Sequence, residues 1–294
     1  MNRKICSLTV ALSLFVATSF SQATNELDQI SVKSETAGGV VQMLHCEGGF
    51  GGGNVAASIG PDGILLVDNM YKAITPKLVD AVKKNSNAAI RYVINSHFHA
   101  DHIEGNSVLS RSSIIIAQEN LLKRFRHKPG WATAEAFPQL VFSDNLMLNF
   151  NGEDIRIFHL PNGHTDCDAI VYFTKSAVIH LGDMYFKGMF PAVYKEGGGD
   201  VLQLIRNLEK VLDEIPDNVK VIPGHGELGT KADLRYYVNM LKKTTSIVQA
   251  GIKAGKTVKQ LQEEKVLAEY DALGSGGAQT TDQYLAMLYK LLAV

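Results

Sequence analysis

The chain has 294 residues, of which 46% are hydrophobic and 20% are charged. This composition is typical of a globular protein, and it excludes a disordered chain, a collagen, a coiled coil and a disulfide-stapled miniprotein. The 29 basic and 30 acidic side chains give a formal net charge of −1. A nucleic-acid binder is therefore not expected, because such proteins displace counterions with an excess of basic residues.

Residues 1–23 have the pattern of a secretory signal peptide. Two basic residues near the start precede an apolar stretch over residues 5–20, and the small residues Ser21 and Ala23 mark a cleavage site. The apolar stretch is short for a transmembrane helix. We therefore expect an exported protein, periplasmic or secreted, with no membrane anchor after cleavage and a mature domain of residues 24–294.

Two cysteines, Cys46 and Cys167, remain in the expected mature chain. Exported proteins often form disulfides, so the two residues could pair. Two free thiols are an equal alternative, because the sequence gives no distance between them. Both alternatives stay open at this point.

Beyond the signal, short apolar runs alternate with amphipathic segments, which is typical of an α/β protein. Strands are predicted at residues 40–44, 55–59, 64–67, 92–94, 114–116, 146–150, 155–160, 169–173, 177–181 and 220–222. Helices are predicted at residues 75–84, after Asp200, and from near residues 230, 257 and 281. Thr75 is expected to cap its helix ahead of Pro76. The strands are apolar enough to need helices on both sides, so one α/β domain is predicted.

The tip of the first predicted hairpin, residues 47–53, is rich in glycine. Five of these seven residues are glycine, with Phe50 among them. A segment of this composition does not form a regular helix or strand. We therefore expect a long, mobile tip between the strands at 40–44 and 55–59.

A cluster of histidine and aspartate follows the strand at 92–94. His97 and His99 are two residues apart, so their side chains point to the same side of an extended chain. Asp101 and His102 follow at a turn, where adjacent side chains project differently and can face a second ion. Imidazole and carboxylate are ligands suited to zinc. The cluster therefore predicts part of a zinc site.

Three further candidates, His164, Asp183 and His225, each follow a predicted strand. Ligand sites in open α/β sheets gather beyond the carboxyl ends of strands, so these residues could converge with the first cluster. Each is weak evidence alone. Together they supply seven ligands, the number that two bridged zinc ions need.

From about residue 40 to residue 230, the chain resembles the metallo-β-lactamase superfamily, with every metal motif in order. The resemblance implies a four-layer αβ/βα sandwich and two Zn²⁺ ions. It also implies that the hairpin tip, including Phe50, is a mobile flap over the site and can contact substrate. The His at position 99 favours zinc, since the flavodiiron relatives carry Glu there. The implied first zinc ligands are His97, His99 and His164; those of the second are Asp101, His102 and His225; Asp183 bridges.

One departure from the family pattern concerns substrate. Broad-spectrum β-lactamases with a three-histidine first site carry a cysteine where this chain has Asp183. An aspartate at that position is what lactonases and glyoxalase II-like thioesterases carry. The expected function is therefore a zinc hydrolase that opens acyl bonds of small molecules, of β-lactam or lactone type. A glyoxalase II-like thioesterase and a non-catalytic zinc-binding protein are the alternatives.

The expected chemistry is attack by a hydroxide that bridges the two zincs, since each cation lowers the pKa of bound water. Asp101 would bind a zinc and orient the hydroxide, and Asp183 would hold the metal pair. Asp68 is a candidate for orienting a ligand imidazole by hydrogen bonding, with a surface turn as its alternative. Lys187 is a candidate for pairing with a substrate carboxylate. The expected partner is a small acyl substrate, and the oligomeric state stays open.

Overall fold

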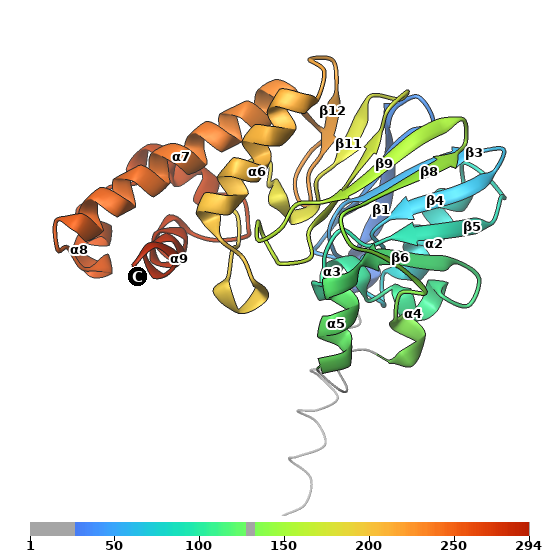
Figure 1. Cartoon of the computed structure of the whole chain (residues 1–294), viewed down its shortest axis with the longest axis horizontal. Coiled ribbons are helices and arrows are strands. Elements are labelled where there is room, and N and C mark those ends of the chain that lie inside the picture. Colours follow the sequence, from blue (N-terminus) through green and yellow to red (C-terminus); the bar gives the residue numbers. More distant parts are fainter. Residues whose placement is uncertain (1–26, 128–132, 294) are drawn as a thin grey trace, which may run out of the picture.

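The computed structural model describes residues 27–127 and 133–293. The predicted signal peptide, residues 1–23, lies outside the described residues. Two mixed β-sheets face each other, and helices cover their outer faces (Figure 1). In the described part of the chain, no helix is both long enough and apolar enough to cross a membrane.

The first sheet has its strands in sequence order. The strands up to β4 pair antiparallel, and those from β4 onward pair parallel. Parallel pairing requires crossovers, and these hold the helices between β4 and β6. The strands are β1 (Ser31–Gly38), β2 (Val41–Glu47), β3 (Val55–Gly60), β4 (Gly63–Val67), β5 (Ile90–Ile94), β6 (Ile114–Gln118) and β7 (Leu140–Phe142).

The second sheet has the order β13-β12-β11-β10-β9-β8. All its neighbours are antiparallel except β11 and β12, which are parallel. The connection between β11 and β12 contains a long amphipathic helix, as a parallel pair needs. The strands are β8 (Asn145–Phe150), β9 (Glu153–His159), β10 (Ala169–Phe173), β11 (Val178–His180), β12 (Lys220–Ile222) and β13 (Gly229–Thr230).

Helices lie on the outer face of each sheet. α2 covers the first sheet, and α6, α7 and α9 cover the second (Figure 1). The α3, α4 and α5 segments follow β5 and β6 at one end of the first sheet. The bounds are α2 (Thr75–Lys83), α3 (Ala100–Ile103), α4 (Asn106–Leu109), α5 (Glu119–His127), α6 (Val201–Glu214), α7 (Lys231–Lys253), α8 (Val258–Glu263) and α9 (Thr281–Leu292).

Apolar side chains fill three layers. One cluster lies between the sheets and includes Val67 from β4 and Val171 from β10. A second lies between the first sheet and α2, and a third lies between the second sheet and the helices α6, α7 and α9. Each sheet therefore buries both faces, and the predicted four-layer αβ/βα sandwich is confirmed.

Every predicted strand has a counterpart in the structure, and so does every predicted helix. The Thr75 cap is a correction, because the N-cap is Ile74 and Thr75 is the first helical residue. A turn already forms before the helix, and the Thr75 hydroxyl donates backward to the carbonyl oxygen of Tyr71, 3.0 Å away. The helix after Asp200 does begin with that residue as its cap, since the carboxylate accepts from two backbone amides of α6.

The two cysteines are free thiols. Cys167 is buried, and burial raises the pKa of its thiol. The Cys46 sulfur lies 3.7 Å from the sulfur of Met70. The pairing that the sequence left open is therefore not present in this structure.

Candidate metal centre

Strand ends bring the predicted ligands together at one edge of the sandwich. Asp68 follows β4, and the segment 97–102 follows β5 and enters the short helix α3. His164 follows β9, Asp183 follows β11, and His225 follows β12. The chain therefore places all the candidates beyond the carboxyl ends of strands, the usual position for a site in an α/β sheet.

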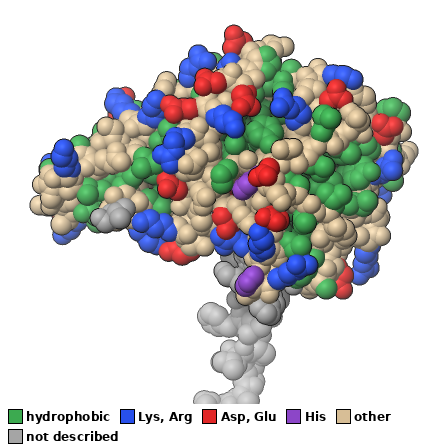
Figure 2. Space-filling view, in the orientation of Figure 1, with side chains coloured by type: hydrophobic (Ala, Val, Ile, Leu, Met, Phe, Trp, Pro, Cys, Tyr) green, Lys and Arg blue, Asp and Glu red, His purple; other side chains and the backbone are tan. Residues whose placement is uncertain are grey.

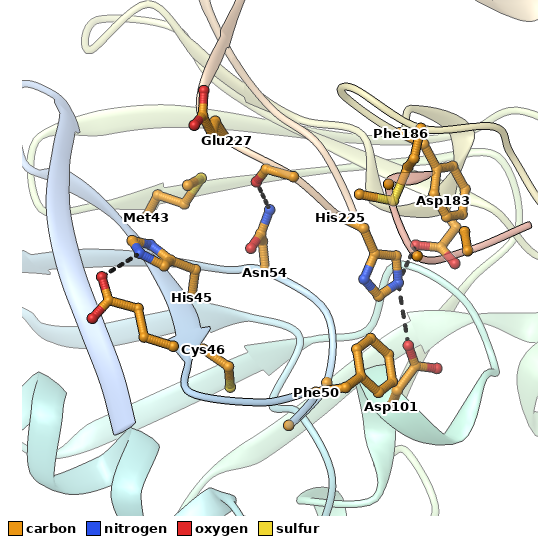
Figure 3. A pocket seen from close by; sticks show the side chains of 18 of the residues that line it. Met43, His45, Cys46, Phe50, Asn54, Asp101, Asp183, Phe186, His225 and Glu227 are labelled. Carbon is orange, nitrogen blue, oxygen red and sulfur yellow. Dashed lines mark hydrogen bonds and ion pairs between the residues drawn. The ribbon is translucent and has the colours of Figure 1, made fainter. Parts of the chain in front are cut away.

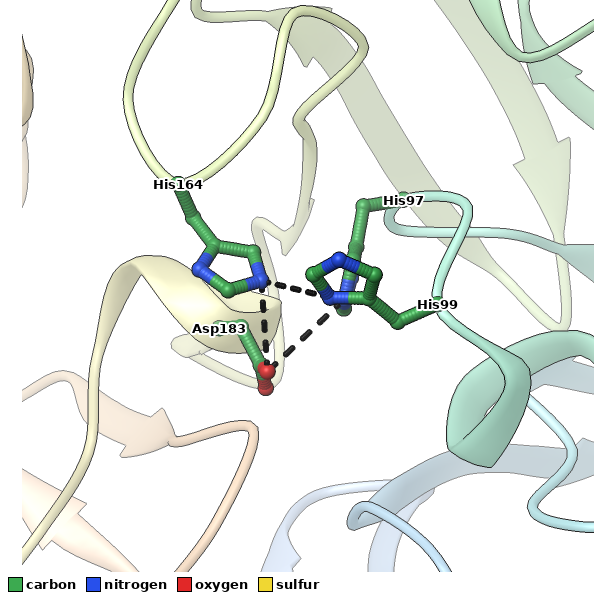
Figure 4. Close-up of side chains that lie close together, drawn as sticks. All are labelled: His97, His99, His164 and Asp183. Atoms are coloured by element: carbon green, nitrogen blue, oxygen red, sulfur yellow. Dashed lines mark hydrogen bonds and ion pairs between the residues drawn. The ribbon is translucent and has the colours of Figure 1, made fainter. Parts of the chain in front are cut away.

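The first ligand set consists of His97, His99, His164 and one oxygen of Asp183, which surround one point (Figure 4). The Nε2 atoms of His97 and His164 lie 3.1 and 2.8 Å from Nδ1 of His99. Asp183 Oδ2 lies 3.7 Å from His97 Nε2 and 3.4 Å from His164 Nε2. Four ligand atoms thus face one another without any protein atom between them.

The second set consists of Asp101, His102 and His225, with the other oxygen of Asp183. Figure 3 shows Asp101 and Asp183 directed at the ring of His225. Asp101 Oδ2 lies 3.2 Å from His225 Nε2 and 3.5 Å from His102 Nε2. Asp183 Oδ1 lies 3.1 Å from His102 Nε2 and 3.3 Å from His225 Nε2. Asp183 is therefore the one side chain among the described residues with an oxygen in each set.

The donor spacing fits a pair of divalent metal ions. Tetrahedral zinc with ligand bonds near 2.1 Å separates its ligand atoms by about 3.4 Å, close to the distances in both sets. Asp183 Oδ1 is buried and accepts no hydrogen bond within the protein, which leaves its lone pairs available. Nitrogen and carboxylate donors of this kind suit zinc better than calcium or magnesium.

The protonation states of the two sets differ. Burial lowers the pKa of His164 to about 3 and holds the pKa of His97 well below its ordinary value. Both imidazoles are therefore neutral at pH 7, the form that binds a metal. Burial also opposes the charged form of His225, but the Asp183 and Asp101 carboxylates outweigh it and raise the pKa of His225 to about 9.

Asp68 orients His102. Its Oδ2 lies 2.7 Å from Nδ1 of His102, and the carboxylate also accepts hydrogen bonds of 2.7 Å from the backbone amide and the hydroxyl of Ser96. Asp68 is completely buried, so the alternative of a surface turn is excluded. The hydrogen bond at Nδ1 leaves Nε2 of His102 directed at the second ligand set.

Asn54, at the base of the hairpin tip, holds the loop that carries His225. Its side-chain amide donates to the carbonyl oxygens of Pro223 at 3.0 Å and Gly226 at 2.8 Å, and its backbone amide donates to Gly224 at 2.8 Å. Gly224 is required here, because a Cβ on it would lie 2.0 Å from Asp183 Oδ1. Three hydrogen bonds from one residue thus fix the loop on both sides of His225.

Replacing Asn54 with alanine should lower the affinity for the second metal ion by about 10-fold or more, because the His225 loop loses two of its three tethers. The first set does not include His225, so its affinity should change little. Competitive zinc titration with a chromophoric chelator measures the binding of the first and of the second zinc ion separately.

Asn151 provides a matched control for Asn54. Its buried side-chain amide also donates to two acceptors, the Ser58 hydroxyl and the Gly63 carbonyl, near the β3–β4 turn. Asn151→Ala should lower the melting temperature while both zinc-binding steps keep their affinity. Equal losses of the two steps in Asn54→Ala, or no loss, would contradict the assigned role.

A cavity of about 1190 Å³ opens above the metal ligands (Figure 3). One wall is polar and comes mainly from β1, β2 and the loop after β12. The other wall is largely apolar and comes from the segment after Asp183 and from the chain near residue 277. The polar wall includes Lys33, Glu35, His45, Glu47 and Glu227; the apolar wall includes Phe186, Met189, Ala192, Tyr194 and Ala278.

Phe50 lies beside the metal ligands, and the mobility of the hairpin tip that carries it stays a prediction. Its ring is 62% exposed, stacks on His225 with centroids 5.5 Å apart, and meets the edge of Tyr71. Phe186 stacks on His225 at 5.3 Å. Phe50 therefore presents an apolar surface next to the second ligand set, where a substrate can contact it.

Lys187 does not face the cavity, which corrects its candidacy as a substrate-binding residue. Its ammonium donates to the carbonyl oxygen of Leu228 at 2.8 Å and pairs with Asp233 at 3.5 Å. Asp233 belongs to the capping box at the start of α7. The Lys187 ammonium is thus bound at the start of α7, which lies far from Lys187 in the sequence.

Asp168 is a positioning residue that the sequence analysis missed. It is buried, and it accepts hydrogen bonds from the backbone amides of His164 at 2.6 Å and Thr165 at 3.0 Å. Burial raises the pKa of Asp168 to about 7. It shapes the loop that presents His164, and the four-residue spacing from His164 was the one signal available.

The sandwich and the two His/Asp ligand sets together define a protein of the metallo-hydrolase class. The family model described as the metallo-beta-lactamase superfamily matches residues 48–244, more than half of the chain. The chain belongs to this superfamily.

The sequence relatives include proteins of two different names. The chain is 25% identical to a metallo-beta-lactamase type 2 of Bacillus sp. (strain 170), over 81% of this chain and 96% of the relative. It is 27% identical to a hydroxyacylglutathione hydrolase of Prochlorococcus marinus (strain MIT 9312), over 61% and 69%. A solved metallo-beta-lactamase from Pontibacter korlensis shares the fold with a TM-score of 0.63 and 16% identity, covering 72% of this chain and 99% of that structure.

Proposed function

We propose that the protein is an exported dinuclear zinc hydrolase that opens acyl bonds of small molecules, with neutral lactones and esters preferred over β-lactams. The observation that carries this proposal is the position of Asp183, with one oxygen in each of two ligand sets at the floor of a cavity. Export rests on the signal-like sequence of residues 1–23. A non-catalytic zinc protein needs no such cavity above its metals.

Two zinc ions in these sets would supply Lewis acidity toward a substrate carbonyl and lower the pKa of bound water. Asp101 lines the cavity, where its carboxylate can accept a hydrogen bond from the attacking water and fix its orientation. Water adds its oxygen to the acyl carbon, the bond to the leaving group breaks, and the leaving group takes up the proton. Phe50 and Phe186 shield one side of His225 each and exclude bulk water from that ligand.

The charges of the cavity favour a neutral acyl substrate. Among the described residues that line it, Lys33 is the single lysine or arginine, and it pairs with Glu47 at 3.8 Å. Lys187 is held elsewhere. Away from the metal ligands, a carboxylate on a β-lactam or on a glutathione thioester would thus meet several acidic side chains and one engaged cation. This favours neutral lactones and esters over β-lactams and glutathione thioesters as substrates.

The test is hydrolysis of a cephalosporin, a neutral lactone and an acyl-glutathione thioester by zinc-loaded protein. We expect the lactone to give the highest kcat/KM, and a chelator to reduce it by at least about 100-fold, with recovery on adding zinc. The matched control is the Asp213→Asn variant, an exposed change on α6, which should behave as the wild type. Turnover that survives chelation, a trapped acyl-enzyme, or two bound zincs without any turnover would contradict the proposal.

A further inference from the structure

The chain continues well beyond the part that matches the family model, which ends at residue 244. α7 leads away from the sandwich to α8, and the 3-10 helix Ala268–Ser275 then leads to α9, which packs along α7 (Figure 1). We call residues 254–293 the C-terminal extension. Its segment 276–278, between the 3-10 helix and α9, returns to the segment after Asp183 and lines the cavity.

The extension is attached to the apolar wall of the cavity by specific contacts. Gln279 is buried and its amide donates to the carbonyl oxygen of Pro191 at 2.6 Å. The backbone amide of Val193 lies 3.1 Å from the sulfur of Met287 in α9. Gly276 packs so closely that a Cβ on it would lie 2.4 Å from Cβ of Met189. The extension therefore holds the segment 189–193 in place.

The segment 186–194 also contacts the metal ligands. It therefore lies between the extension and the two ligand sets, and it contacts both. The carbonyl oxygen of Ala192 lies 2.6 Å from Nδ1 of His164, and Phe186 lies against His225 and His164. A group bound at the metals and directed along this wall would meet Phe186, which contacts two of the ligands, and Ala278 of the extension lines the same cavity. The family-matched region thus supplies the ligands, while the extension completes the wall beside them.

This wall is suited to an apolar group, and the cavity has room for one. The side chains of the lining residues Phe186, Met189, Ala192, Tyr194 and Ala278 consist mainly of carbon and sulfur. The cavity volume of about 1190 Å³ exceeds the 300–1,000 Å³ that is common for drug-sized ligands. A bare lactone or β-lactam ring would leave most of this space filled with water. A substrate that extends beyond its reacting ring fits the space better.

We propose that the C-terminal extension builds a subsite for the apolar tail of the substrate, so that the enzyme takes acyl compounds with an alkyl or aryl chain of several carbons. The proposal rests on the proposed hydrolase function for the position of the reacting group. Ala278 is the key residue of the subsite, because it lines the cavity and its side chain is exposed. A large side chain at that position would fill the subsite without disturbing the core.

The experiment measures binding to zinc-loaded protein and needs no turnover. Two probes share a thiol and a carboxylate that bind at the metals, and they differ in their tails: thioglycolate has none, and 2-mercaptooctanoate has a six-carbon chain. Each methylene that becomes buried adds about a fourfold gain in affinity. Wild-type protein should therefore bind 2-mercaptooctanoate at least about 10-fold more tightly than thioglycolate in calorimetric titrations.

Ala278→Trp should reduce this tail advantage at least fivefold, and Met189→Gln should reduce it through polarity without filling space. The control is Ala250→Trp, the same change on the exposed face of α7, which should keep the full advantage. Melting temperatures and zinc content show that each variant is folded and loaded. Equal affinities in the wild type, or an advantage that survives both Ala278→Trp and Met189→Gln, would overturn the subsite. Failure to take up zinc would instead overturn the proposed function, and the subsite with it.

Discussion

Replacing Asp183 with asparagine should abolish formation of the two-metal centre, with the affinity for at least one ion falling by about 100-fold or more. The side chain keeps its size, so the effect is one of donor chemistry. One amide atom is an NH₂ group, which cannot bind a metal, and the neutral side chain no longer offsets the charge of two cations. Elemental analysis of protein dialysed against buffered zinc measures the loss, and kcat/KM for the preferred substrate should fall with it.

Control variants separate ligand chemistry from damage to the fold. Asp213→Asn is the same change on the exposed face of α6 and should retain both ions and full activity. Asp183→Asn should still fold, because asparagine keeps the size of the buried side chain and one oxygen that can accept a hydrogen bond. Two zinc ions held with unchanged affinity by Asp183→Asn would show that the carboxylate does not join the two sets.

The ligand residues could be predicted because each depends on local information. His164, Asp183 and His225 directly follow apolar strands that the sequence pattern identifies, and strand ends on one side of a sheet converge. The fold class followed from the same alternation of strands and helices. Its four-layer form came from the resemblance to a known family and is confirmed by the three apolar layers.

Residues that position the ligands were harder to predict, because their contacts join loops far apart in the sequence. Asn54 reaches Pro223 and Gly226 across 169 and 172 residues. Nothing near Asn54 in the sequence indicates that contact. The prediction that Lys187 pairs with substrate was wrong for the same reason. Its partner Asp233 lies at the start of α7, after β12 in the sequence.

Edge strand β1 and the C-terminal extension show a second limit of prediction from hydrophobic periodicity. β1 was not predicted, because Lys33, Ser34 and Glu35 make it mostly polar and exposed. It lies at the edge of its sheet, where one side pairs with β2 and hydrophobic alternation is weak. The helix starts near residues 257 and 281 were predicted, but no periodicity could show that the segment 276–278 between these helices reaches the cavity.

Asp68→Ala should cause the largest loss of stability of any single change considered, about 3–5 kcal/mol in the free energy of unfolding of the metal-free protein. Three groups lose their acceptor at a fully buried position: the backbone amide and the hydroxyl of Ser96, and Nδ1 of His102. Alanine also tolerates poorly the backbone φ of 68° at residue 68. Urea unfolding monitored by circular dichroism in the presence of a chelator measures the loss.

The same variant should also lower the affinity for the second zinc ion by about 10–100-fold. The reason is that His102 loses the hydrogen bond that directs its Nε2 at the second ligand set. Asp62→Ala is the matched control, since Asp62 lies at the opposite end of β4 in an exposed turn and its carboxylate accepts one hydrogen bond, from the backbone amide of Asn151. It should lose about 1 kcal/mol of stability and keep both zinc affinities. If Asp68→Ala loses stability while its second zinc step is unchanged, Asp68 is a buried structural acceptor only, and His102 is oriented by its own helix α3.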